Sequence, residues 1–467
     1  MAPAASKYNI DMCHGPLFSK IVLFSIPLFL TGLLQLLFHL ADMVVLGQFS
    51  TTKNAFAAVT ATGTITGLFV NVFMGLSVGA NVIIARYYGA RDSKLTRRAT
   101  HTAIAVSLLG GIVLAITGLI FTEPMLHLTN VPDSLMKHSS LYIRIFCSGI
   151  PFLILYNFGS AILRAVGDTR RPLFILAAAG VGNVILNLVF VIIFKMDVAG
   201  VAAATVISNI IAALCVFRIL LHSTDACRVK VSLIRIAPAM LRDILWIGLP
   251  AGIQSAFFSV SNLIIRSALN LLGEDVIAGN GAAALLEGFI YMGSYAYHHT
   301  AISFVGQNLG GKKPYRIVKS ILYCAATVSV LTLVMGYGFL LSGKMLLGIF
   351  NLTPVQLEIG LTQMFYIYTV YFTLGLMDTT AGALRGLGYS IISAVVTFLG
   401  VCVLRVGWVC FVFPHYRSLP CLLVSYPISW TLTGTVNVII VFIALRKIFR
   451  KHPHDLQKLN HESLLHT

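Results

Sequence analysis

The chain has 467 residues, of which 57% are hydrophobic and only 10% are charged, and its formal net charge at pH 7 is +17. This composition excludes an ordinary soluble globular domain and indicates a polytopic membrane protein. In a soluble protein so much positive charge would favour a nucleic-acid partner, but here most Lys and Arg residues lie in the tails and in alternate loops, as the positive-inside rule describes. We therefore expect no nucleic-acid partner.

Apolar stretches long enough to cross a membrane recur along the whole chain. A helix needs about 20 residues to cross a hydrocarbon layer of about 30 Å, and lipid cannot satisfy free backbone amides, so each span must be helical. The charges of the loops predict that both termini lie in the cytoplasm. We expect the protein in the inner membrane of the cell. The twelve predicted spans cover residues 20–46, 55–82, 99–121, 139–161, 172–194, 198–221, 243–270, 277–303, 315–341, 360–383, 390–413 and 421–445.

An internal repeat divides these spans into two halves. One constant offset relates Gly89 to Gly310, Arg164 to Arg385 and Ser208 to Ser429. Six spans per half is an even number, so the halves are related by an axis along the membrane normal, and the lobe interface is the expected place for a substrate. The predicted parts are a cytoplasmic tail (1–19), an N-lobe (20–221), a cytoplasmic linker (222–242), a C-lobe (243–445) and a basic cytoplasmic tail (446–467).

Several kinds of chemistry are missing from the sequence. There is no GxxxxGK[ST] phosphate-binding loop, and no cysteine pair has CxxC spacing, so we expect no ATP site and no cofactor. GLSVG (75–79) matches the GxSxG pattern of hydrolases, but it lies inside an apolar helix rather than at a strand-to-helix turn. Gly75 and Gly79 are better explained as a close helix-packing face, and we do not expect an enzyme.

Asp42 is the most informative residue of the N-lobe, because it ends an apolar run that begins after Lys20. Gln35 and His39 precede it at helical spacing, so the three side chains share one face. Gln and His in a span are often helix-to-helix hydrogen-bonding groups. A carboxylate at membrane depth costs several kcal/mol unless it is paired, wet or protonated, and usually marks an ion or proton path.

The fifth and sixth spans contribute polar side chains that can join Asp42. Asn183 and Asn187 are one helical turn apart in GNVILN, and Thr205 lies in the next span. Carboxylate, amide and hydroxyl oxygens are ligands that hard cations such as Na⁺ accept. The sequence therefore predicts a site for H⁺ or Na⁺ at Asp42, Asn183, Asn187 and Thr205, while packing is the alternative for each asparagine.

The second half carries its own ionisable residues. Glu287 could form a structural ion pair with an arginine, or it could couple ion movement to transport. Asp378 corresponds to Asn157 in the repeat and lies toward the cytoplasmic end, where a gate or a packing role is expected. The predicted substrate cavity contains Gln35, His39, Asn157, Asn262, Arg266, Glu287, Tyr291, Asp378 and Arg405.

The sequence resembles the multidrug and toxic compound extrusion (MATE) family over nearly its whole length. The first matching segment covers residues 11–49, from DMCHGPLF to FHLADMVVLGQF. The others are RYYGARD, the pair ILRAVGDTRRPL and ALRGLGYS, and DVAGVAAATVIS. The resemblance implies two six-helix lobes and the export of organic, often cationic or amphipathic compounds in exchange for H⁺ or Na⁺. In the DinF-like branch a first-span Asp acts with fifth-span Asn and Asp residues and a sixth-span Thr. Asp42, Asn183 and Thr205 match, whereas Asn187 replaces the second acid.

The leading hypothesis is thus a monomeric secondary antiporter that moves a small-molecule substrate across the lipid bilayer by alternating access. A flippase for lipid-linked precursors is the alternative, but it would need more intramembrane arginines than Arg266 and Arg405. An intramembrane enzyme would need a paired nucleophile and base, which the spans do not offer. A channel fits the two-lobe repeat less well than a transporter does.

Overall fold

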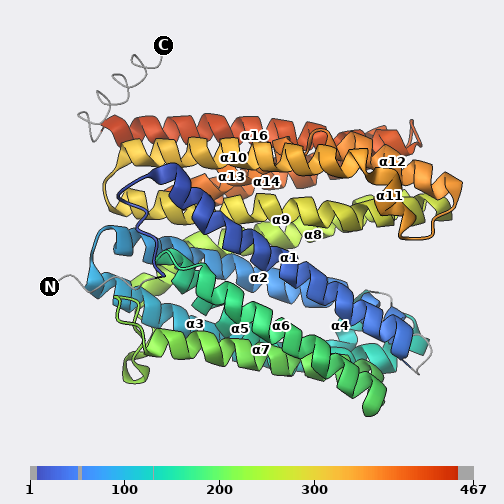
Figure 1. Ribbon diagram of the computed structural model, residues 1–467, viewed down its shortest axis with the longest axis horizontal. Coiled ribbons are helices and arrows are strands. Elements are labelled where there is room, and N and C mark those ends of the chain that lie inside the picture. Colours follow the sequence, from blue (N-terminus) through green and yellow to red (C-terminus); the bar gives the residue numbers. More distant parts are fainter. Residues whose placement is uncertain (1–7, 51–54, 130, 451–467) are drawn as a thin grey trace. The chain divides into compact units, whose positions relative to one another are not determined.

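The computed structural model describes residues 8–50, 55–129 and 131–450, and these ranges are almost entirely helical (Figure 1). The long apolar segments become helices because an α-helix satisfies its backbone hydrogen bonds within one segment. In chain order the elements are α1 (Leu17–Phe49), α2 (Ala55–Gly89), α3 (Ser93–Ile120), α4 (Thr122–Leu128), α5 (Asp133–Ala165), α6 (Arg170–Leu188), η1 (Val189–Ile193), α7 (Asp197–Leu221), η2 (Val231–Leu233), α8 (Pro238–Asn270), α9 (Glu274–Gly310), α10 (Pro314–Leu341), α11 (Gly343–Gly348), α12 (Pro354–Tyr368), α13 (Tyr371–Leu387), α14 (Ser390–Thr397), η3 (Phe398–Val403), α15 (Leu404–Gly407), η4 (Trp408–Val412) and α16 (Leu419–Arg450).

The described residues contain the helices that a multi-pass membrane protein requires. Eleven of them are long and apolar enough to cross a membrane, and α12 with α13 makes a twelfth when this pair, bent by 46°, counts as one span. The predicted all-helical polytopic fold is thereby confirmed. The predicted tenth span, 360–383, corresponds to the bent pair, and the short helices α4 and α11 lie outside the predicted spans.

The chain forms two compact units whose boundaries lie inside helices. The first unit comprises Met1–Ile10 and Leu30–Gly252, and the second comprises Asp11–Phe29 and Ile253–Thr467. The two halves of α1 therefore belong to different units, and so do the two halves of α8. Each boundary lies close to a proline within the helix, Pro27 in α1 and Pro250 in α8. Proline removes a helical hydrogen bond, so both helices have a weak point there.

The packing inside each unit reflects the internal repeat. In the first unit α5 packs against α2, α3 and α7, and in the second unit α13 packs against α9, α10 and α16. The offset found in the sequence relates the end of α5 to the end of α13, so these two helices hold equivalent central positions. Gly167 and Gly388, which follow them at the same offset, both have positive φ, 99° and 93°. Such a φ favours glycine, so the repeat extends to the backbone conformation.

Two glycines of α2 let it approach α8 very closely within the first unit. A Cβ added to Gly75 would lie 2.2 Å from the backbone nitrogen of Gly252, and one added to Gly79 would lie 2.3 Å from the carbonyl oxygen of Ile244. Ser77 between them is buried and donates to the carbonyl of Met74 at 2.7 Å. The GLSVG segment is thus a helix-packing surface, as the sequence analysis predicts.

Turns of π-helix lie next to polar residues in both units. Asn187 is the last residue but one of α6, just before η1, and Arg405 lies in the short α15 between η3 and η4. The element η1 begins at Val189 and η4 at Trp408, close to the offset of the repeat. Because π turns in helices occur frequently at functional sites, both positions are relevant to the candidate site.

Candidate functional site

Asp42 on α1 is held by an asparagine of α6 inside the first unit. The side-chain nitrogen of Asn187 donates to Asp42 Oδ1 at 2.5 Å, and Asn187 is fully buried. Asn183, one turn earlier on α6, is 5% exposed. The helical spacing in GNVILN therefore places both amides at the carboxylate, as predicted. A hydrogen bond to an ionised acceptor is among the stronger ones in proteins, so this pair ties α1 to α6.

The orientation of the Asn183 amide decides how the cluster is satisfied. In one orientation Asn187 also donates to Asn183 Oδ1 at 3.2 Å. When the Asn183 amide is turned over, its nitrogen donates to Asp42 Oδ1 at 2.9 Å, and its oxygen accepts from the backbone N–H of Thr205 at 3.3 Å. The turned orientation gives each amide atom a better partner, and it brings α7 into the cluster.

Thr205 contributes differently from the sequence prediction. Its hydroxyl donates to the carbonyl of Val201, one turn back on α7, at 3.0 Å. The threonine therefore reaches the cluster through its backbone amide, while its hydroxyl oxygen keeps lone pairs that can accept. Tyr142 on α5 is close enough to interact electrostatically with Asp42. Four helices, α1, α5, α6 and α7, thus surround the carboxylate.

The side chains around Asp42 can be compared with the ligands that Na⁺ requires, which are oxygen atoms. Asn187 presents its nitrogen to Asp42, so this arrangement suits a carboxylate without a bound cation. Within the described ranges, the buried Asn187 Oδ1 has no hydrogen-bonding partner. A half-turn of this amide would place that oxygen beside the carboxylate. The cluster can therefore accept either a proton on Asp42 or, after the amide turns, a small hard cation.

Gln35 and His39 share the α1 face with Asp42, but both side chains are exposed in the structure. Asn157 on α5 donates its amide to the carbonyl of Leu153 in its own helix at 2.9 Å. These three predicted cavity residues belong to the first unit, and no hydrogen bond among the described residues joins them to the Asp42 cluster.

Glu287 on α9 accepts from tyrosine rather than from arginine. Tyr371 Oη on α13 donates to Glu287 Oε1 at 3.3 Å, and Gln363, Arg405 and Arg266 are further neighbours. The contact ion pairs at 4.0 Å or less between described residues do not include Glu287. A close Glu287–arginine ion pair, one of the two readings of the sequence, is therefore not formed.

Arg405 is only 1% exposed and is held by groups other than carboxylates. Its Nε donates to Ser429 Oγ at 2.8 Å, and its guanidinium lies 4.2 Å from the ring centre of Tyr426. A cation–π contact in a desolvated place can contribute about 2 kcal/mol. Arg266, by contrast, is exposed, and Asn262 is half-buried on the same helix, α8.

A second buried polar group surrounds Asp378, and the sequence analysis did not assemble it. The carbonyl of Asp378 lies 2.7 Å from His298 Nδ1, so this nitrogen carries the proton and donates. His298 Nε2 must then accept from Arg385, whose Nη1 lies 2.9 Å away. Arg385 Nη2 also donates to Gln254 Oε1 at 2.7 Å. Tyr291 on α9 interacts electrostatically with both Asp378 and Arg385.

Arg385 follows the predicted tenth span, 360–383, and lies in the glycine-rich LRGLGYS segment, so the sequence favours a loop position for it. In the structure it is inside α13 and 7% exposed. The sequence signal for this group is the spacing of Tyr291, Tyr295 and His298, which puts three polar side chains on one face of α9. The arginine partner on α13 could not be read from that stripe, because it depends on how two helices pack.

The comparisons with known proteins agree on one family. The family model MatE matches residues 27–193 and 250–409. The curated relative "Probable multidrug resistance protein YpnP" of Bacillus subtilis is 29% identical over 400 residues, covering 85% of this chain and 88% of that protein. The "Probable multidrug resistance protein NorM" of Thermotoga maritima is 26% identical over 411 residues, covering 86% of each chain. A solved structure, "Outward-facing conformation of a multidrug resistance MATE family transporter of the MOP superfamily", matches with a TM-score of 0.89 and 20% identity, covering 96% of this chain and all of the other.

Proposed function

The chain belongs to the MatE family, and on that basis we propose that it is a secondary antiporter which exports organic, cationic or amphipathic compounds in exchange for H⁺ or Na⁺. The observation that carries the proposal is the intramembrane carboxylate of Asp42, held by Asn187 and surrounded by four helices of one unit. Relatives named as multidrug resistance proteins support the substrate class. The DinF-like branch, the cytoplasmic termini, the inner membrane and the monomeric state stay predictions.

The Asp42 cluster offers two arrangements that an ion can select. An ionised carboxylate accepts the Asn187 amide N–H, and the structure contains this hydrogen bond. A protonated carboxyl can instead donate, and the Asn187 Oδ1, which lacks a partner among the described residues, can turn to accept. Loss of a hydrogen bond to a charged group changes the free-energy difference between the two arrangements by about 1.5–3 kcal/mol. An ion that favours one arrangement can therefore shift how α1 packs against α6.

Substrate export would follow if the two arrangements favour different openings of the transporter. Such coupling requires the ion to bind the two states with different affinity. The bend available at Pro27 lets the second half of α1, which carries Asp42, respond to the cluster without moving the first half equally. H⁺ needs only the carboxyl, whereas Na⁺ would be held by oxygens of Asp42, Asn183, Asn187 and Thr205.

The flippase alternative gains no specific support. It would need several cations that can hold a lipid-linked phosphate. Arg405 donates to Ser429 and packs on Tyr426, and Arg385 donates to Gln254 and His298, so of these three arginines Arg266 alone is exposed. The curated relatives named as multidrug proteins also favour export of small molecules.

The test is uptake of a fluorescent organic cation into inverted vesicles under an imposed pH gradient or Na⁺ gradient. Wild type should respond to one of the two gradients, and Asp42→Asn should abolish that response. Glu358→Gln is the matched control, because it removes an exposed carboxylate at the start of α12 and should leave uptake unchanged. Wild-type rates for Asp42→Asn would refute the site, and uptake that depends on ATP alone would refute antiport.

A further inference from the structure

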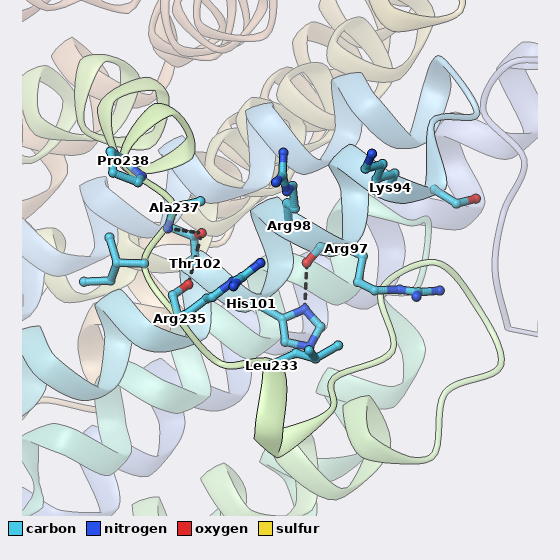
Figure 2. Close-up of a pocket in the computed structure, with 11 residues that line it drawn as sticks. Lys94, Arg97, Arg98, His101, Thr102, Leu233, Arg235, Ala237 and Pro238 are labelled. Carbon is cyan, nitrogen blue, oxygen red and sulfur yellow. Dashed lines mark hydrogen bonds between the residues drawn. The ribbon is translucent and has the colours of Figure 1, made fainter.

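A basic cavity lies between the first turns of α3 and the segment that leads from the linker into α8, in the first unit. It has a volume of about 610 Å³ (Figure 2). Four cationic side chains line it, three from α3 and one from the linker: Lys94, Arg97, Arg98 and Arg235. All four are exposed, and the carboxylate nearest in sequence, Asp92, caps the helix by accepting from the backbone N–H of Leu95 at 2.9 Å.

These cations are not neutralised within the described ranges. The contact ion pairs found there involve Asp11, Glu123 and Asp168, none of which lines the cavity. Side chains of like charge that share one cavity repel one another, so an anion that enters it relieves this repulsion. Arginine forks match the oxygen geometry of phosphate especially well.

The wall of the cavity is fixed by hydrogen bonds between α3 and the linker. His101 Nδ1 lies 2.7 Å from the carbonyl of Arg97, and His101 Nε2 accepts from the backbone N–H of Lys230 at 3.0 Å. Thr102 Oγ1 donates to the carbonyl of Arg235 at 3.4 Å and accepts from the N–H of Ala237 at 3.2 Å. Figure 2 shows His101 and Thr102 of α3 facing the linker segment. Arg235 is therefore positioned rather than carried on a free loop.

Apolar side chains border the cations on the linker. Leu233 and Ile236 line the cavity and are 40% and 39% exposed, and Val231 nearby is 64% exposed. A soluble anion would gain nothing from these side chains. A lipid would use both parts of the surface, since its headgroup meets the cations while its glycerol and upper acyl chains cover the apolar residues. The positive-inside rule places this end of α3 at the cytoplasmic leaflet, where anionic lipids gather.

We propose that this cavity binds the phosphate headgroup of an anionic phospholipid of the cytoplasmic leaflet. The ligand class is a phosphodiester with at least one net negative charge, and the side chains that hold it are Arg97, Arg98 and Arg235, with Lys94 at the rim. The site is separate from the Asp42 cluster, and its occupancy would fasten the linker to α3.

Native mass spectrometry of the full chain in detergent, titrated with phosphatidylglycerol, tests the proposal. The variant Arg97→Gln/Arg98→Gln/Arg235→Gln should weaken the tightest lipid-binding event at least about tenfold, since it removes three of the four positive charges that attract the headgroup. The matched control Arg446→Gln/Lys447→Gln/Arg450→Gln removes the same charge from the end of α16 and should leave that event unchanged. Phosphatidylcholine, which carries no net charge, should bind wild type and the cavity variant equally weakly.

Two further arms keep the result unambiguous. A variant with lysine at the same three positions keeps the positive charge and should regain most of the lipid binding. The melting temperature of the glutamine variant checks that this variant is folded. Glycerol 3-phosphate and inorganic phosphate distinguish the source of the phosphate, and neither should displace the lipid at millimolar concentration. Equal weakening in the cavity and control variants, or displacement by the soluble phosphates, would overturn the proposal.

Discussion

The close approach of α2 to α8 makes a quantitative prediction about Gly75. A methyl group there would lie 2.2 Å from the nitrogen and 2.3 Å from the Cα of Gly252, both backbone atoms that cannot rotate away. To reach the 3.4 Å of an ordinary contact the two helices would have to separate locally by about 1.2 Å. A gap of 0.5–1 Å already forfeits about a quarter to a half of each neighbouring contact energy.

The expected cost of Gly75→Ala follows from two opposing effects. Overpacking typically costs about 1–3 kcal/mol, whereas replacing glycine by alanine within a helix gains up to about 1 kcal/mol. We expect a net loss of about 1–2 kcal/mol, because the obstructing atoms are backbone and cannot relax separately.

Gly63 on the same helix is the matched control, since a Cβ there has no neighbour within 4 Å. Gly63→Ala should leave the stability unchanged or raise it slightly through helix propensity alone. The assay is thermal unfolding of the purified protein in detergent, with both variants prepared in parallel. Equal melting temperatures for Gly75→Ala and Gly63→Ala would refute the packing argument.

Three further predictions concern single side chains. Asn187→Ala should slow gradient-driven transport. In a double-mutant cycle with Asp42→Ala, measured as the free energy of unfolding, the two effects should fall short of additivity by about 1.5–3 kcal/mol, the strength of a hydrogen bond to a charged group; full additivity would contradict the contact. Tyr371→Phe removes the hydroxyl that donates to Glu287 and should lower the free energy of unfolding by about 1–3 kcal/mol, measured by thermal unfolding; an unchanged melting temperature would contradict a stabilising role. Burial raises the pKa of Asp11, but the hydrogen bonds from the Cys13 amide and the His14 side chain outweigh it and leave this pKa below its ordinary value. The carboxylate therefore stabilises the folded state above the ordinary pKa of about 4, and this contribution is lost as the pH falls through the lowered pKa. The protection of the Cys13 amide, measured as its exchange rate relative to the intrinsic rate at the same pH, should therefore fall at acidic pH in wild type but not in Asp11→Asn.

Much of the fold was accessible from the sequence, because hydropathy over about 20 residues depends on local composition. The repeat could be read as well, since Gly167 and Gly388 need the same backbone conformation at equivalent places. The contact between Asp42 and Asn187 followed from a polar residue on each of two apolar helices, for which the membrane offers few other partners.

The remaining features depend on tertiary contacts that leave no local signal. The bend between α12 and α13 has no proline at its break, so a continuous apolar run predicted one straight span. The glycines around Arg385 favour a turn, yet this residue lies in α13 and its side chain donates to partners on α8 and α9. The division of α1 at Leu30 depends on which residues each half contacts.

The divided α1 constrains the order in which the protein can fold during synthesis. Its first half belongs to the second unit, where Ser25 Oγ bonds to Thr300 Oγ1 at 2.9 Å, 275 residues later in the chain, and Phe24 stacks edge-on against Phe304. When the ribosome has completed the first unit, these partners have not yet been made. The second unit therefore cannot close its core until α9 is inserted, and it does so around a segment that entered the membrane first. A break in the linker would yield two fragments, neither of which contains all the residues of its own unit.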